Sequence, residues 1–308
     1  MKIKMLEKIL VLLFGFALFF GCIKDNSGDQ APDVVGYPRL YQLPNATEEH
    51  MMGYIIRTVD GHVVVIDGGR KGDADQLSEL IRAGKENGTV DAWFITHPHG
   101  DHIDALVEIV NNHPEINVLN IYASMLDLEL IQRYEPDAQA ADGRYHVFFE
   151  ENEDIFFELS LGDRFVFGDV TLKVLAVKNP DITDFRILNN SSAVFRVYTH
   201  EVSVLFLGDL NVPGGRRLLS QHKGTGNLRS DIVQIAHHGL NSGVYRDVYE
   251  EIAPSIALWP TLEYMWNYHT SLVRGWMEEL EVYSIPSYRG LTKIELTQEG
   301  LRRIKERH

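Results

Sequence analysis

The segment Thr-His-Pro-His-Gly-Asp-His at residues 96–102 constrains the fold more than any other part of the chain. It follows the short apolar run Ala92–Ile95, which predicts a strand that ends in a turn and delivers polar side chains to the edge of a sheet. Three histidines and one aspartate within six residues would be costly to bury without a ligand. The metal-binding side chains of this segment are His97, His99, Asp101 and His102.

Pro98 bends the chain between the first two histidines, so His97 and His99 can converge on one ion. Asp101 and His102 follow where a helix is expected to begin, so their side chains can face a second cation a few ångströms from the first. Imidazole nitrogen and carboxylate oxygen are ligands of zinc, and manganese and iron accept them too. The segment therefore predicts half of a two-cation site.

Two later apolar runs end in side chains of the same kind. Gly208-Asp209 follows the run Val202–Leu207, and a carboxylate with two oxygens can bridge two cations. Ala236-His237-His238-Gly239 follows the run Asp231–Ile235 and supplies a further nitrogen. We expect these strand ends to complete the site.

The rest of the chain predicts alternating strands and helices. Asp60-Gly61 between the apolar runs Met52–Arg57 and His62–Ile66 is a strong hairpin signal. This alternation favours an α/β fold with helices packed outside the sheets. Further strands are expected at Val118–Tyr122, Phe165–Val177, Ala193–Tyr198, Ile256–Trp259 and Thr292–Leu296, and helices around Leu77–Ile81, from Asp101, at residues 125–133, around Leu218 and at residues 271–281.

The string His-x-His-x-Asp-His resembles the signature of the metallo-β-lactamase superfamily. Asp67-Gly68-Gly69 is similar to the Asp-x-Gly turn of that superfamily, and the resemblance covers roughly residues 40–296. It implies a four-layer αββα sandwich with the metals at one edge, and it says little about the substrate.

The resemblance also implies a ligand set with one departure. Many members supply a further histidine between the first motif and the bridging aspartate, and here only His113, His146 and His200 are available. Asn189-Asn190-Ser191-Ser192, together with His-His-Gly, resembles the branch with competence-protein β-lactamase-like domains and phosphorylcholine esterases. The implied ligands of the first metal are His97, His99 and Asp209, with Asn190 or water nearby, and those of the second are Asp101, His102, Asp209 and His238.

We choose His238 over His237 as the ligand because the last ligand of the superfamily commonly precedes glycine. His237 and Asn190 would then face the substrate, with His237 stabilising charge or protonating the leaving group, while Asp101 orients the nucleophile. The other single histidines, His50 among them, are read as surface or core residues.

These features predict a hydrolase with two divalent metal ions, Zn²⁺ in the first place and Mn²⁺ or Fe²⁺ as alternatives, which stabilise hydroxide for attack. A phosphodiester is the first choice of substrate. A carboxylic ester, lactone or β-lactam is the alternative, and a non-catalytic metal-containing envelope binding protein is a third hypothesis.

The N-terminus resembles a bacterial lipoprotein signal. Three lysines and an apolar run in residues 1–21 precede Cys22, the only cysteine, and residues 22–36 are polar like a flexible tether before a hydrolase domain at 37–308. We expect an extracytoplasmic protein anchored to a membrane through a lipid on Cys22. Loss of three Lys and one Glu with the signal would take the formal charge from −15 to −17. Such an acidic chain makes nucleic acid an unlikely partner and favours a small-molecule or envelope-polymer substrate.

Overall fold

A computed structural model describes residues 36–184 and 186–306. The predicted signal peptide, Cys22 and nearly all of the predicted tether lie outside the described residues. Within the part of the chain that is described, none of the helices is both long and apolar enough to cross a membrane.

Two seven-stranded sheets form the centre of the fold. The first has the order β16 (Thr292–Glu295), β1 (Arg39–Gln42), β2 (Gly53–Arg57), β3 (Val63–Asp67), β5 (Ala92–Phe94), β7 (Ile121–Ala123), β8 (Phe156–Glu158). The second has the order β15 (Tyr283–Pro286), β14 (Ile256–Trp259), β13 (Ile232–Gln234), β12 (Ser203–Phe206), β11 (Val194–Tyr198), β10 (Val170–Ala176), β9 (Arg164–Phe167). A small third sheet pairs β4 (Thr89–Val90) with β6 (Asn117–Val118).

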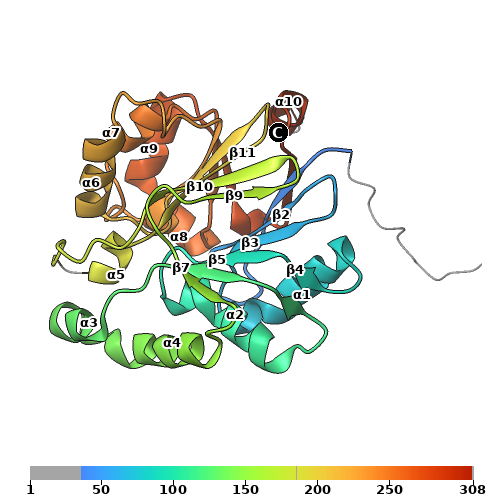
Figure 1. The fold of residues 1–308 in the computed structure, drawn as a ribbon. Helices are drawn as coiled ribbons and strands as arrows, with labels where there is room; N and C mark the ends of the chain where they lie inside the picture. Colours follow the sequence, from blue (N-terminus) through green and yellow to red (C-terminus); the bar gives the residue numbers. More distant parts are fainter. Residues whose placement is uncertain (1–35, 185, 307–308) are drawn as a thin grey trace, which may run out of the picture. The chain divides into compact units, whose positions relative to one another are not determined.

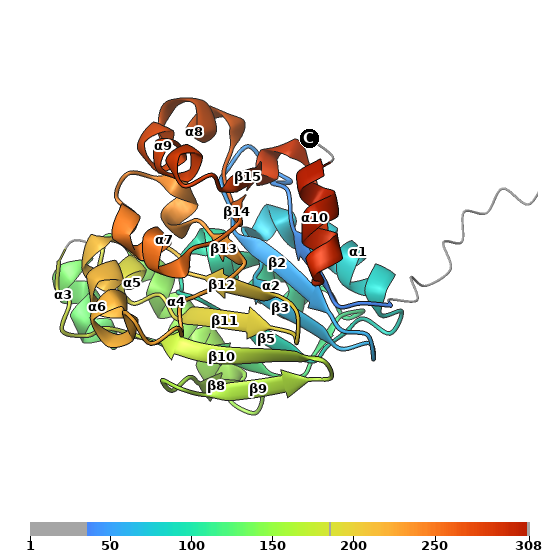
Figure 2. The ribbon, with the colours of Figure 1, turned by 90° about the horizontal axis from the view of Figure 1, so that it is seen from above.

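Helices cover the outer faces of both sheets (Figures 1 and 2). The first sheet packs against α1 (Ala74–Gly84), α2 (Gly100–Asn112) and α4 (Gln139–Glu151), and the second against α6 (Val212–His222), α7 (Arg246–Ile252) and α9 (Ser271–Glu279). The remaining helices are α3 (Leu128–Tyr134), α5 (Ile187–Asn190), α8 (Glu263–Tyr268) and α10 (Gln298–Glu306). The predicted four-layer αββα sandwich is therefore confirmed.

The strands are apolar on both faces because each sheet is covered on both sides. In β3, Val64 and Ile66 point into the core between the sheets, while Val63 and Val65 pack under the helices. In β12, Val204 and Phe206 point inward and Leu205 outward. This alternation with a period of two sets the register of each sheet.

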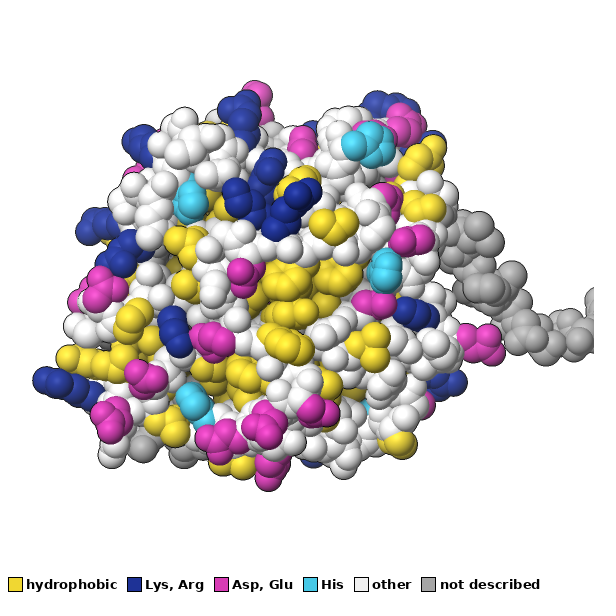
Figure 3. All heavy atoms as spheres, in the orientation of Figure 1, with side chains coloured by type: hydrophobic (Ala, Val, Ile, Leu, Met, Phe, Trp, Pro, Cys, Tyr) yellow, Lys and Arg dark blue, Asp and Glu magenta, His cyan; other side chains and the backbone are white. Residues whose placement is uncertain are grey.

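The free edge strands β8 and β9 and the turn between them leave apolar side chains in contact with solvent. Phe157 in β8, Leu161 in the turn and Val166 in β9 are all exposed. Figure 3 shows hydrophobic side chains in the middle of the face on which β7 and β9 lie, with acidic side chains spread below them.

Several predicted boundaries shift in the structure. The hairpin at Asp60-Gly61 is confirmed by the antiparallel pair β2 and β3. The run Val118–Tyr122 is divided between β6 and β7, which belong to different sheets. The first helix ends at Gly84, four residues before Gly88, where the chain turns with a φ of +64°.

The ends of three strands place the candidate site. β5 runs parallel to β3 and β7, and β13 runs parallel to β12 and β14. Parallel neighbours bring their carboxyl ends to one edge, so the residues that follow β5, β12 and β13 meet there.

Candidate metal centre

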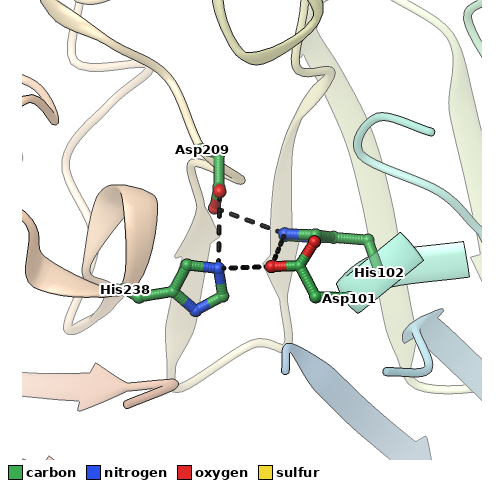
Figure 4. Close-up of side chains that lie close together, drawn as sticks. All are labelled: Asp101, His102, Asp209 and His238. Atoms are coloured by element: carbon green, nitrogen blue, oxygen red, sulfur yellow. Dashed lines mark ion pairs between the residues drawn. The ribbon is translucent and has the colours of Figure 1, made fainter. Parts of the chain in front are cut away.

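Four buried side chains converge at this edge (Figure 4). One ligand atom from each lies within 4.8 Å of the others, and the four residues are Asp101, His102, Asp209 and His238. His238 Nε2 lies 3.0 Å from Asp101 Oδ2 and 3.4 Å from Asp209 Oδ2. His102 Nε2 lies 3.4 Å from Asp209 Oδ1 and 3.7 Å from Asp101 Oδ2. These are the residues implied for the second metal.

The backbone reaches this geometry through left-handed conformations directly after the strands. Gly208 has a φ of +56°, and a Cβ there would lie 2.9 Å from both Ser192 and Thr96. His237 and His238 have φ values of +51° and +55°, which are uncommon for residues other than Gly, although Asn, Asp and His adopt them more often than the rest. The positive φ values turn the chain sharply, so consecutive histidines project in different directions.

The residues implied for the first metal lie beside the cluster. His97 Nε2 and His99 Nδ1 are 3.1 Å apart, and His97 Nε2 is 4.0 Å from Asp209 Oδ2. Asp209 therefore faces both positions, one oxygen toward His102 and the other toward His97 and His238. This arrangement suits a carboxylate that bridges two cations.

The second nitrogen of each clustered imidazole is held by a fixed partner. His102 Nδ1 lies 2.7 Å from Asp67 Oδ2, and His238 Nδ1 lies 2.6 Å from the Pro260 carbonyl oxygen. When the imidazole is neutral and donates Nδ1–H to this acceptor, Nε2 has a free lone pair that faces the cluster. Metal-binding histidines characteristically have such outer partners, which fix the tautomer and the ring orientation.

The carboxylates and imidazoles of the cluster shift one another's pKa values. Burial alone would raise the pKa of Asp101 and Asp209, but the surrounding imidazoles hold both well below the usual range. Burial alone would lower the pKa of His102 and His238, but the two carboxylates raise the pKa of His102 well above its usual range and that of His238 to about 10. In His97, burial and the neighbouring histidines lower the pKa well below the usual value.

The residues also pass a direct test of fit for a metal. His102 Nε2, His238 Nε2 and Asp209 Oδ1 are buried and make no hydrogen bond to any described residue. Buried polar atoms in a native protein almost always have a partner. Three such atoms that converge on one point are explained by a cation bound between them.

The first prediction concerns proton release from this cluster. Because the pKa of His238 is about 10 without a cation, this imidazole is protonated at neutral pH and must lose its proton to bind a metal. Metal affinity should therefore rise as the pH increases from 6 towards about 10. Calorimetric titration of Zn²⁺ into metal-free protein, in buffers with different ionisation enthalpies, measures the release. A binding heat that does not depend on the buffer would contradict it.

His237 lies next to the cluster but faces a different set of groups. Its Nδ1 lies 2.8 Å from Asn211 Oδ1 and 3.0 Å from Ser242 Oγ. Its Nε2 lies 3.1 Å from Asn189 Nδ2 and 3.8 Å from Asp209 Oδ2. Burial lowers the pKa of His237 to about 4, so the ring is neutral at physiological pH.

The structure does not bring the side chain of Asn190 to the metal centre. Asn190 Oδ1 accepts the backbone N–H of Gly214, and its Nδ2 donates to the Arg186 carbonyl oxygen. The preceding residue, Asn189, contacts His237 instead. The sequence could not decide between the two amides, because their positions differ by only one residue in a short helix.

Two residues at the site had no signal in the sequence. His50 Nε2 lies 3.1 Å from Asp101 Oδ2, on a loop far from the motif. Glu135 Oε1 lies 3.6 Å from His99 Nε2, and its Oε2 accepts the N–H of Leu188. Neither belongs to a strand end or a periodic pattern that would single it out.

A family model described as "Metallo-beta-lactamase superfamily" matches residues 53–283. Among curated proteins, ComE operon protein 3 of Bacillus subtilis (strain 168) is 24% identical over 173 residues, which are 55% of this chain and 20% of that protein. Hydroxyacylglutathione hydrolase of Aliivibrio fischeri (strain MJ11) is 38% identical over 66 residues, 21% of this chain and 24% of that protein. The chain thus spans about a fifth to a quarter of the length of these relatives.

Solved structures share the fold. CmlA from Streptomyces venezuelae, described as a diiron beta-hydroxylase, superposes with a TM-score of 0.53 at 14% identity, over 84% of this chain and 54% of that chain. At this identity the likeness concerns the architecture alone.

Proposed function

Because the chain belongs to the metallo-β-lactamase superfamily, we propose that it is a metal-dependent hydrolase that uses two divalent ions, Zn²⁺ in the first place, to cleave a phosphodiester-type substrate. The observation that carries the proposal is the convergence of buried ligand atoms of His102, Asp209 and His238 that have no hydrogen-bond partner among the described residues, with His97 and His99 beside them. Two divalent cations at these positions would activate water and neutralise the charge that develops during hydrolysis. Since CmlA is a diiron protein of this fold, iron is the alternative metal to test.

We assign the second position to the four clustered residues, with Asp67 and the Pro260 carbonyl as outer partners. In the first position, Glu135 would play the same outer role for His99, since it faces the Nε2 that is turned away from His97. Burial raises the pKa of Glu135, but the hydrogen bonds from His99 and Leu188 outweigh burial and keep it ionised.

We propose that His237 supplies the third nitrogen of the first position, where many relatives have a further histidine. When Nδ1–H donates to Asn211 Oδ1, Nε2 carries no proton and can accept or coordinate but cannot donate. The lowered pKa of His237 likewise leaves Nε2 without a proton at neutral pH. These contacts favour a ligand role over the proton-donor role expected from the sequence.

An exposed cation close to the first position supports an anionic substrate. Arg186 is exposed and precedes α5, whose Asn189 contacts His237. Besides burial and nearer groups, the positive charge of Arg186 lowers the pKa of both Glu135 and His237, so it acts at both sides of the first position. In a chain of formal charge −15, a cation at this place favours a phosphodiester over a neutral ester.

The function is tested with a substrate panel at defined metal loading. We expect the protein with two zinc or iron ions to hydrolyse bis-nitrophenyl phosphate or nitrophenyl-phosphorylcholine. It should hydrolyse nitrocefin and nitrophenyl acetate much more slowly. Faster cleavage of nitrophenyl acetate or nitrocefin would favour the alternative, a hydrolase of a carboxylic ester, lactone or β-lactam. No turnover of any class at full loading would favour the metal-binding envelope protein.

Arg186→Ala provides the second prediction. If Arg186 attracts the substrate anion, its removal should raise KM for the phosphodiester by about tenfold, which corresponds to about 1.4 kcal/mol. The kcat value and the metal content should change little, because Arg186 is not a ligand. The control is Arg216→Ala, which removes another exposed cation. Arg216 lies over the Tyr245 ring. Equal KM values for both variants and the wild type would contradict the role.

The setting of this hydrolase is part of the proposal. A lipid on Cys22 and a polar tether would hold the domain at the outer side of a bacterial membrane, within reach of small molecules or envelope polymers. Labelling with a radioactive fatty acid, with Cys22→Ser as the comparison, tests the anchor.

A further inference from the structure

The loop between β1 and β2 delivers one more histidine to the metal centre. His50 Nε2 lies 3.1 Å from Asp101 Oδ2. The His50 ring also stands edge-on to the ring of His238, with centroids 4.7 Å apart and an interplanar angle of 71°. The side chain is 38% exposed, so it lies at the boundary between the buried cluster and solvent.

This position is built by the fold, because the loop is fastened on both sides of His50. The N–H of Met52 donates to the Asp101 carbonyl oxygen at 2.9 Å, so the loop is tied to the ligand segment itself. Arg70 Nε donates to the His50 carbonyl oxygen at 3.1 Å and pairs with Glu49 at 2.9 Å. The freedom of the His50 backbone is therefore small.

The loop has a third anchor further from the site. Asp73 accepts the N–H of Ala46 through Oδ1 and the N–H of Arg70 through Oδ2, both at 2.9 Å. One buried carboxylate thus joins the loop to the residue that holds His50. A side chain held in this way is preorganised for its contact with Asp101.

The contact matters most when a cation is present. Asp101 Oδ2 now lies within 3.0 Å of His238 Nε2 and 3.7 Å of His102 Nε2. If these two nitrogens held a cation through their lone pairs, neither of them could donate a hydrogen bond to the carboxylate. His50 then is the neighbouring imidazole, among the described contacts of Asp101, that can still donate a hydrogen bond to it.

We propose that His50 is a positioning residue of the metal centre, which holds the Asp101 carboxylate through its Nε2–H. Asp101 thereby gains an outer partner, as His102 has in Asp67 and His238 in the Pro260 carbonyl. The inference rests on the proposed metal centre and is independent of the choice of substrate.

The test compares His50→Ala, His50→Gln and His50→Asn in the full-length chain. A glutamine amide can place its N–H near the position of Nε2, whereas asparagine is one methylene too short. His62→Ala is the matched control, because His62 is 39% exposed and lies 2.9 Å from Asp91, at the opposite end of β5. Metal-free proteins are titrated with Co²⁺, and the visible absorption bands and the affinity for each equivalent are recorded.

We expect His50→Ala and His50→Asn to weaken one of the two Co²⁺ equivalents by about 10–100-fold and to shift its bands. His50→Gln should restore most of the affinity, and His62→Ala should match the wild type. Where a substrate is cleaved, kcat should fall with KM nearly unchanged. If His50→Ala bound cobalt as tightly as His62→Ala does, the inference would be overturned. Equal losses of cobalt affinity in His50→Ala and His50→Gln would also overturn it, because they would indicate a structural role only. If the wild-type protein binds cobalt but cleaves no phosphodiester, the proposed substrate fails and the cobalt result still decides the role of His50.

Discussion

Asp209→Asn is expected to abolish hydrolysis and to remove bound metal from both positions. The Asp209 carboxylate faces His97, His102 and His238 at distances of 3.4–4.0 Å. An amide keeps the shape but has no charge, and its nitrogen cannot coordinate as carboxylate oxygen does. The loss of several kcal/mol of charge stabilisation corresponds to at least about 10³-fold in kcat/KM. Metal analysis of the purified variant and turnover of the best substrate in the panel measure the two effects.

The control for this variant is Asp231→Asn. Asp231 lies at the other end of β13, where its carboxylate accepts the N–H and the hydroxyl of Ser203. This change should cost some stability and leave the metal content intact. If Asp209→Asn kept both ions and near-normal turnover, the bridging role would be wrong. A thermal unfolding curve of the metal-free variant close to that of the metal-free wild type would show that the loss is not a folding defect.

Asp67→Asn is expected to disable the centre from outside the ligand set. Asp67 is fully buried and has a φ of +53°. Its Oδ1 accepts the N–H of Thr96, while Oδ2 accepts the Thr96 hydroxyl and lies 2.7 Å from His102 Nδ1. The backbone N–H cannot move, so the oxygen of an asparagine must stay with it and the amide NH₂ must face His102. This forces the imidazole into the tautomer that carries its proton on Nε2, where the metal binds.

We expect metal affinity in Asp67→Asn to fall by about 10–100-fold, with activity lost in proportion. Asp67→Ala should destabilise the fold more than Asp67→Asn does. It leaves several buried donors without an acceptor, and each costs about 1–3 kcal/mol of folding free energy. Asp91→Asn is a matched control, since Asp91 accepts the N–H of Val63 and lies 2.9 Å from His62 Nδ1 at the far end of β5. Zinc affinity by competition with a chromophoric chelator separates the variants. Wild-type affinity in Asp67→Asn would show that the tautomer of His102 is not controlled by Asp67.

The sequence predicted the parts of the site that follow strands. His97, Asp209 and His238 each come directly after a buried apolar run, and parallel strands bring such ends together whatever lies between them. His50 and Glu135 escaped prediction because they reach the site from a loop and from the end of α3, where their position depends on tertiary contacts. Nothing in their local sequence distinguishes them from surface residues.

The fold was predictable for a similar reason. Strands buried on both faces are apolar runs that end abruptly, so their positions were found within a few residues. The helix α4 was missed because it contains Gly143 and because the exposed Val147 obscures the helical spacing of its buried aromatic residues. Short strands such as β1 and β8 carry too few residues for a period to be recognised.

The position of the four-residue cluster has a mechanical consequence. Asp101 and His102 follow β5 of the first sheet, whereas Asp209 and His238 follow β12 and β13 of the second. An ion held by all four is a cross-link between two layers that otherwise adhere through apolar side chains. Metal binding would then determine how readily the two sheets separate at this edge. Backbone amides next to the four-residue cluster in both sheets would therefore gain or lose protection from hydrogen exchange together.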